Sequence, residues 1–205
     1  MRDNVPSTHS AFYILGAGAI GHLWACNLRS LGKKVVLLVR EQSASPSLDI
    51  QYSPNYHHSQ NLENRRFTYT VQLENLSSDD SNTTIENLII ATKSQDVISA
   101  FQSVKHRLSN KSHILVLSNG MGYHESIAST LLETFSNSNL WAGVSSDGAI
   151  LSNNHVINHM GKGTTYIGRF NAPELSDRNR CFYLAVSGSQ ADSPLLNLQV
   201  ADSIK

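Results

Sequence analysis

The chain has 205 residues, with 16 basic and 16 acidic side chains and a formal net charge of zero. This balance argues against a nucleic-acid or membrane-surface binder, since either would show a basic excess, and we expect neither partner. The length suits one large domain, or one domain and part of another, with a core that needs no staples. Cys26 and Cys181 lie in no C-x-x-C pattern, so no disulfide framework and no metal site is predicted.

The first ten residues are polar and contain no apolar core of a signal peptide. No apolar run in the chain approaches the roughly 20 residues that span a bilayer. We therefore predict a disordered N-terminus over residues 1–10 and a cytoplasmic protein.

An apolar run over residues 12–15 leads into a G-x-G-x-x-G motif formed by Gly16, Gly18 and Gly21. In a strand-to-helix turn, the first glycine permits the tight bend, the second lets the backbone approach a pyrophosphate, and the third lets the helix pack on the strand. The motif alone is weak because glycines also mark ordinary turns. Its context strengthens it, since residues 19–31 have helical apolar spacing and residues 33–40 read as a second buried strand. The sequence therefore predicts a dinucleotide-binding βαβ unit.

Arg40 ends the second predicted strand, where an NAD-binding unit carries an acidic residue for the ribose hydroxyls. A guanidinium there can form charge-assisted hydrogen bonds with a 2′-phosphate, which an acid would repel. This residue favours NADP(H) over NAD. Glu41, one residue later, is the competing acid, and a solvated strand-end charge is the alternative role for Arg40.

The middle of the chain alternates predicted strands and helices. Residues 42–64 are rich in Ser, Gln, Asn and Pro and are predicted to be irregular, with His57 and His58 lacking further ligands for a metal. Ser94 is expected to cap the helix that follows the strand ending at Lys93. The other elements are strands over residues 66–73, 88–93 and 114–118, helices over residues 95–104 and 123–135, and a short apolar run over residues 140–144.

The last part of the chain adds further elements. Val156–Ile157 and Thr164–Gly168 flank two glycines and are predicted to pair antiparallel with each other. A helix is expected within Pro173–Val186 and a strand within Leu195–Val200. Parallel strands that alternate with helices indicate a doubly wound, Rossmann-type α/β fold, here mostly parallel with a C-terminal antiparallel extension.

Four separate segments end at the same predicted edge of this sheet. They contribute the glycine turn of residues 16–21, Arg40, Lys93 and the turn of residues 119–122. Because ligands on such sheets bind outside the carboxyl ends of the strands, this convergence predicts a dinucleotide site. A surface charge on a loop is the alternative for Lys93, and an ordinary turn residue is the alternative for Asn119.

With these motifs, the chain resembles the N-terminal domain of ketopantoate reductases, which are NADPH-dependent 2-hydroxyacid dehydrogenases of pantothenate synthesis. The resemblance covers about residues 11–170. Its motifs are ILGAGAIG over residues 14–21, Arg40, the lysine of ATK over 91–93, NGMG over 119–122, Gly148-Ala149, NHVINH over 154–159 and YIG over 166–168.

The resemblance implies a binding role for each matching residue. Arg40 and Lys93 would bind the 2′-phosphate, Asn119 would lie beside the nicotinamide and the 2-keto acid substrate, and the backbone near Ala149 would touch the cofactor. The implied oxidoreductase reaction is the NADPH-dependent reduction of 2-dehydropantoate to pantoate. Pyrophosphate binding falls to the glycine turn, that is to Gly16, Ala17, Gly18, Ala19, Ile20 and Gly21.

The resemblance also places the catalytic proton donor beyond this chain. In the family, a helical C-terminal domain supplies the lysine that protonates the developing alkoxide, and Lys205 aligns just before it, so no catalytic residue is assigned here. We expect residues 11–170 to form the NADP-binding domain and residues 171–205 to lead into the helical domain. Asp147 stands where relatives often carry His or Tyr, a departure that bears on substrate fit.

Two other functions stay open from the sequence. One is a non-catalytic NADP-binding module or truncated paralogue, which the coding sequence past Lys205 would distinguish. The other is a different 2- or 3-hydroxyacid dehydrogenase, which a panel of 2-keto acids would distinguish. In the family, the helical C-terminal domain would cover one face of this domain. An apolar face left uncovered would favour self-association, so the formation of a homo-oligomer also stays open.

Overall fold

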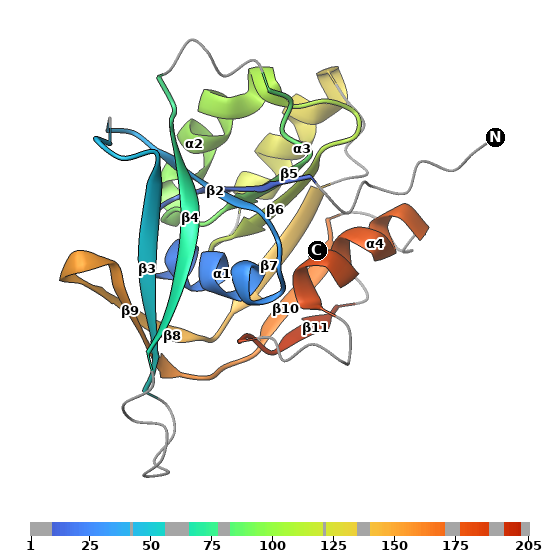
Figure 1. The fold of residues 1–205 in the computed structure, drawn as a ribbon. Coiled ribbons are helices and arrows are strands. Elements are labelled where there is room, and N and C mark those ends of the chain that lie inside the picture. The colour runs from blue at the N-terminus through green and yellow to red at the C-terminus, as the bar shows by residue number, and fades with distance from the viewer. Residues whose placement is uncertain are drawn as a thin grey trace.

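The computed structural model describes residues 10–41, 43–55, 66–77, 83–120, 122–134, 140–170, 177–188 and 195–201. Residues 1–9 of the N-terminus predicted to be disordered (residues 1–10), the adjacent His57 and His58, and Met121 of the NGMG turn lie outside these ranges. The described strands form one sheet in the order β11-β10-β7-β6-β5-β1-β2-β4-β3-β9-β8, with helices packed on it (Figure 1).

The strands are β1 (Phe12–Leu15), β2 (Val35–Val39), β3 (Ser47–Pro54), β4 (Phe67–Asn75), β5 (Asn87–Ile90), β6 (His113–Leu117), β7 (Leu140–Ser145), β8 (Gly148–Ser152), β9 (Val156–Gly161), β10 (Thr165–Arg169) and β11 (Leu198–Val200). The helices are α1 (Ala19–Ser30), α2 (Val97–Val104), α3 (Tyr123–Thr134) and α4 (Asp177–Ser187). Short 3-10 turns are η1 (Ser94–Asp96), η2 (Lys105–Arg107) and η4 (Asn153–His155).

The middle of the sheet is parallel and doubly wound. β1 pairs in parallel with β2 on one side and β5 on the other, and β6 and β7 continue the parallel order beyond β5. The chain therefore leaves β1 in one direction for β2 and later returns to the other side for β5. This reversal is the topological switch point of the sheet. The Rossmann-type prediction is confirmed.

The sheet separates two hydrophobic cores because successive side chains on a strand point to opposite faces. In β1, Phe12 and Ile14 belong to the core that holds the buried residues of α1 and α4, whereas Tyr13 and Leu15 face the core with α2 and α3. All four β1 side chains are buried. This burial explains why the strand reads as a continuous apolar run rather than an alternating one.

The prediction that residues 42–64 are irregular is wrong for residues 47–54, which form β3. Apolar Leu48, Ile50 and Tyr52 alternate with polar neighbours, and Ile50 and Tyr52 are buried in the α1 core. β3 pairs antiparallel with β4 and parallel with β9. Helix α1 contacts β3, β4, β8 and β9 as well as β1 and β2, so this end of the sheet curls around α1 (Figure 1).

The predicted antiparallel pairing between residues 156–157 and 164–168 is also wrong, because each of these strands has other partners. β9 pairs with β3 and, antiparallel, with β8. β10 pairs antiparallel with β7 and in parallel with β11. The two strands lie far apart in the sheet order, and residues 162–164 cross between them. The antiparallel extension itself is confirmed through the β7–β10 and β8–β9 pairs.

Two helix predictions change in detail. Ser94 makes no side-chain capping bond in the described structure but begins the 3-10 turn η1, and α2 starts at Val97. In α3, Ile127 and Leu131 face the core and are buried, whereas Leu132 is 65% exposed. None of the described helices has the length and apolar character needed to span a membrane.

Candidate functional site

The three glycines of the turn meet different surroundings. Gly16 has a φ of +111°, and a Cβ there would lie 2.7 Å from the carbonyl carbon of Ala91. A Cβ on Gly21 would lie 2.0 Å from the oxygen of Gly16. A Cβ on Gly18 would meet no described atom within 4 Å. Packing inside the protein therefore requires Gly16 and Gly21, whereas Gly18 leaves open space beside the backbone.

The N-terminus of α1 is built to receive an anion. Its N-cap residue is Gly18, which has no side chain with which to cap the helix. The first turn of α1 contains no acidic residue. The first N–H groups of a helix have no partner inside the helix, and the helix dipole places positive partial charge there. A phosphate beside Gly18 would satisfy both conditions.

A cavity of about 1170 Å³ opens at this turn. It lies at the carboxyl ends of β1, β2 and β5, next to the switch point, where ligands bind in doubly wound folds. Its volume slightly exceeds that of typical small-molecule pockets and suits an extended dinucleotide. Five of the predicted cofactor residues line it, namely Gly16, Ala17, Gly18, Arg40 and Lys93.

Arg40 and Lys93 approach this cavity from two strands. Arg40 directly follows β2, and Lys93 precedes η1 after β5, so β1 and its glycine turn lie between them. Both side chains are exposed. Glu41 and Asp96 line the same cavity, so the rim carries acidic as well as basic groups.

The remaining predicted residues are not part of the cavity lining. Ala19, Ile20 and Gly21 form the first turn of α1, and Ala149 lies half-buried on β8. Asn119 is exposed just after β6. Its turn packs on the loop of Lys93, since a Cβ on Gly120 would come within 3.1 Å of Ser94 Cβ.

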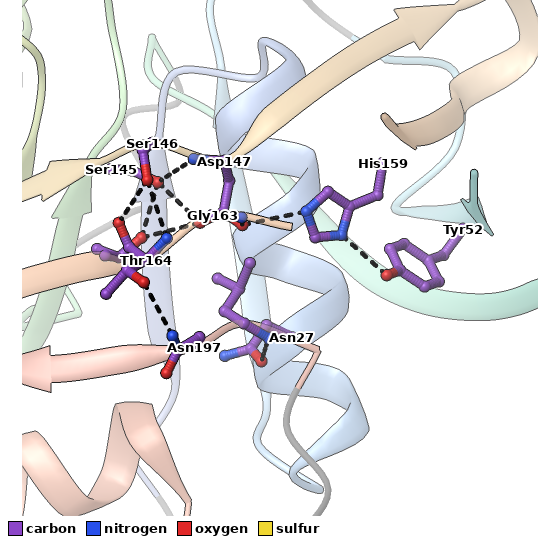
Figure 2. Close-up of polar contacts among 11 residues, drawn as sticks. Asn27, Tyr52, Ser145, Ser146, Asp147, His159, Gly163, Thr164 and Asn197 are labelled. Atoms are coloured by element: carbon purple, nitrogen blue, oxygen red, sulfur yellow. Dashed lines mark hydrogen bonds and ion pairs between the residues drawn. The ribbon is translucent and has the colours of Figure 1, made fainter. Parts of the chain in front are cut away.

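Asp147 is the centre of a buried hydrogen-bond network (Figure 2). Its Oδ1 accepts from the Gly163 N–H at 3.0 Å and lies 3.1 Å from His159 Nε2. Its Oδ2 accepts from the hydroxyls of Ser145 at 2.9 Å and Thr165 at 3.1 Å. Burial raises the pKa of Asp147, but the hydrogen bonds from His159, Gly163, Ser145 and Thr165 together lower it below its ordinary value.

The network extends from Asp147 to β3. His159 Nδ1 lies 3.0 Å from the hydroxyl of Tyr52, so the imidazole bridges the carboxylate and the phenol (Figure 2). Tyr52, Asp147 and His159 are all buried. The Asp147 carboxylate therefore joins strands of the fold and is not presented to a ligand.

Two histidines of the cavity, His22 and His155, were not among the site residues predicted from the sequence. His22 lies in α1, and its ring stacks on that of His155 with centroids 5.7 Å apart and an angle of 11° between the planes. Both residues line the cavity. One signal was present in the sequence, since His22 directly follows the last glycine of the motif, but a polar helix residue usually faces solvent.

Metal binding has no visible basis in the described ranges. No group of three or more His, Cys, Asp and Glu side chains in them is arranged to hold an ion.

The fold and the position of the cavity define a Rossmann-type α/β domain with a ligand site at its topological switch point. Comparison with known proteins makes the assignment specific. Residues 12–172 match the family described as ketopantoate reductase PanE/ApbA. The chain belongs to this family.

Individual relatives agree with the family assignment. The chain is 29% identical over 185 residues to the 2-dehydropantoate 2-reductase of Vibrio cholerae, covering 89% of this chain and 53% of that protein. The structure of 2-dehydropantoate 2-reductase from Porphyromonas gingivalis shares the fold with a TM-score of 0.70 and 15% identity, over 94% of this chain and 64% of that one. The structure of D-mandelate dehydrogenase with NADH and anilino(oxo)acetate shares the fold with a TM-score of 0.67 and 20% identity, over 94% of this chain and 57% of that one. The chain spans about half the length of the curated relatives it matches.

Proposed function

We propose that this chain forms the cofactor-binding part of an NADPH-dependent reductase that converts 2-dehydropantoate into pantoate, a step of pantothenate synthesis. The observation that carries the proposal is the convergence of Arg40, Lys93 and the open face of Gly18 on one cavity. Membership of the ketopantoate reductase family supports the reaction, and the mandelate dehydrogenase that shares the fold was solved with a nicotinamide cofactor.

Different residues of this chain would bind different parts of the cofactor. The pyrophosphate would lie over Gly18, where the uncapped N–H groups of α1 are available. Arg40 and Lys93 would bind the 2′-phosphate from the two sides of β1. Asn119, beside the Lys93 loop, would contact the nicotinamide and the substrate, with the backbone near Ala149 on the cofactor. When bound, NADPH supplies the hydride for the reduction.

The preference for NADPH over NADH can be tested by substituting Arg40 and Lys93 and measuring the affinity for both cofactors. Arg40→Ala and Lys93→Ala should each weaken NADPH binding by about ten- to a hundredfold, because each removes a charge-assisted hydrogen bond worth roughly 1.5–3 kcal/mol. Binding of NADH, which lacks the 2′-phosphate, should change much less. Fluorescence titration of both cofactors provides the measurement, and Lys111→Ala, an exposed cation outside the cavity, is the matched control.

Equal losses for NADPH and NADH would show that Arg40 does not contact the 2′-phosphate. Glu41 would then be the residue to test, because an acid at this position binds ribose hydroxyls. Glu41→Gln should in that case weaken NADH more than NADPH.

The substrate is tested by following NADPH oxidation with 2-dehydropantoate and with a panel of other 2-keto acids on the full-length gene product. Preference for 2-dehydropantoate would support the proposed reaction, and preference for another acid would assign a different hydroxyacid dehydrogenase. Cofactor binding without turnover of any acid would favour the second candidate, a non-catalytic NADP-binding module. That candidate is considered because the chain spans about half the length of its relatives.

A further inference from the structure

His22 has one ring nitrogen bound and the other free. Its Nδ1 lies 3.0 Å from the carbonyl oxygen of Gly18. A carbonyl only accepts hydrogen bonds, so Nδ1 must carry the proton that is donated. Nε2 has no hydrogen-bond partner among the described residues, although the atom is buried and the residue is 2% exposed.

A buried polar atom without a partner needs an explanation, since most such atoms in native proteins are hydrogen-bonded. His22 lines the cavity and lies on the first turn of α1, beside Gly18 and the uncapped helix N-terminus. The residue that carries the free Nε2 thus lies where an anionic ligand would be held. A ligand in the cavity is the partner that the structure suggests for it.

His155 is brought to the same place by an unusual backbone. Asn154 and His155 have φ values of +61° and +55°, so two consecutive non-glycine residues adopt the left-handed conformation. This conformation is uncommon for such residues and tends to occur at functional sites. It places the exposed His155 ring on His22 at the wall of the cavity.

We propose that His22 and His155 form an imidazole pair that binds the pyrophosphate of the dinucleotide at the glycine turn. The inference rests on the proposed function and specifies which group of the cofactor the pair contacts. Phosphate oxygens accept hydrogen bonds, and an imidazolium donates through both nitrogens, so His22 can hold Gly18 through Nδ1 and phosphate through Nε2. The pair anchors the middle of the cofactor, while Arg40 anchors its 2′-phosphate.

The surroundings of His22 disfavour its protonated form, and an anionic ligand would favour it. Burial lowers the pKa of His22, and the neighbouring His155 lowers it further, whereas the Gly18 carbonyl raises it. An anionic pyrophosphate would offset both the burial and the repulsion between the two rings. The other charged or titratable groups of the cavity and of the elements packed on α1 are Arg40, Glu41, Lys93, Asp96, Tyr13, Asp49, Tyr52, Tyr69, Glu74 and His159.

Two substitutions at His22 separate its two nitrogens. His22→Asn keeps an amide donor near the position of Nδ1, so the contact with Gly18 can persist, but it has no atom at the position of Nε2. His22→Gln places an amide group near the position of Nε2. His155→Ala removes the second ring, and His106→Ala is the control, since His106 is exposed and outside the cavity.

Three ligands divide the cofactor into parts for calorimetric titration. NADPH contains both the pyrophosphate and the 2′-phosphate, ADP-ribose contains only the pyrophosphate, and 2′-AMP contains only the 2′-phosphate. His22→Asn and His155→Ala should each lose about tenfold in affinity for NADPH and ADP-ribose, with less than about a twofold change for 2′-AMP. His22→Gln should retain more affinity than His22→Asn. Arg40→Ala should give the opposite pattern between ADP-ribose and 2′-AMP.

The outcomes distinguish this inference from the proposed function. If the wild-type protein binds NADPH and ADP-ribose but the His22 and His155 variants bind them equally well, the imidazole pair is wrong and the cofactor assignment stands. Equal losses for all three ligands would also overturn the pair, since they would indicate a distorted cavity. If the wild-type protein binds neither NADPH nor ADP-ribose, both proposals are overturned.

Discussion

Nε2 of His159 lies 3.1 Å from Oδ1 of Asp147, and both side chains are almost completely closed to solvent. The contact joins β9 to the residues between β7 and β8, and Tyr52 extends it to β3. A network of this kind is costly when one member is removed, because its partners are left buried and unpaired. It provides the first two predictions.

Asp147→Asn should lower the free energy of unfolding by about 2–4 kcal/mol at neutral pH. An amide presents one accepting oxygen where the carboxylate accepts from four groups. Urea denaturation followed by circular dichroism measures the change. Asp49→Asn is the matched control, since Asp49 is exposed and accepts one hydrogen bond, from Thr70, and should change stability by less than about 0.5 kcal/mol. Similar losses in the two variants would contradict a special role for the buried network.

The stabilisation from Asp147 should also depend on pH in one direction. Hydrogen bonds lower the pKa of Asp147 in the folded protein below its ordinary 3.8, so its contribution is complete above about pH 4 and is lost as the pH falls through the folded pKa. The difference in stability between the wild-type protein and Asp147→Asn should therefore shrink below about pH 4. A gap that stays constant down to pH 2 would argue that the carboxylate is not the stabilising form.

Gly18→Ala and Gly21→Ala should separate binding from folding. A Cβ at Gly21 would meet the Gly16 oxygen at 2.0 Å, so Gly21→Ala should lower the melting temperature and NADPH affinity together. Gly18 has open space beside it, so Gly18→Ala should leave the melting temperature within a few degrees and reduce NADPH binding at least about tenfold by keeping the phosphates from the backbone. Normal NADPH affinity in Gly18→Ala would place the pyrophosphate elsewhere.

Cys26 should be unreactive in the native protein. Burial raises the pKa of its thiol to about 12, and the thiolate is the reactive form. With Cys181 replaced by serine, so that one thiol remains, reaction with a disulfide reagent at pH 8 should be more than about a hundredfold slower than in denaturant. Rapid labelling of the native variant would mean that α1 opens readily.

The parts of the fold that were predicted correctly have their cause in the local sequence. β1 is buried on both faces and therefore reads as an unbroken apolar run. Gly21 is needed by backbone packing within the same βαβ unit, and Gly16 by its approach to the backbone of Ala91. Arg40 and Lys93 could be placed at one edge because the carboxyl ends of parallel strands meet there. These inferences need only the chain order and the sheet type.

The features that were missed depend on distant segments. The alternation of Leu48, Ile50 and Tyr52 was a local signal for β3, but it lies in a stretch rich in Ser, Gln, Asn and Pro, and the pairing with β9 depends on residues about a hundred positions later. The pairing of β10 with β7 rather than β9 is likewise a choice among strands with similar local patterns. The ring of His22 is stacked on that of His155, and His155 lies on a distant turn whose left-handed backbone no local motif indicated.

The pairing of β3 with β9 has a consequence for synthesis of the protein. Gln51 pairs with Val156, so during translation this edge of β3 has no partner until about a hundred more residues have been synthesised. Contacts of such high sequence separation slow folding. Until then β3 exposes unpaired backbone groups, which can capture strands of other chains. A nascent chain that stalls before Val156 should therefore aggregate and depend on chaperones, whereas one that continues past β9 closes its own edge.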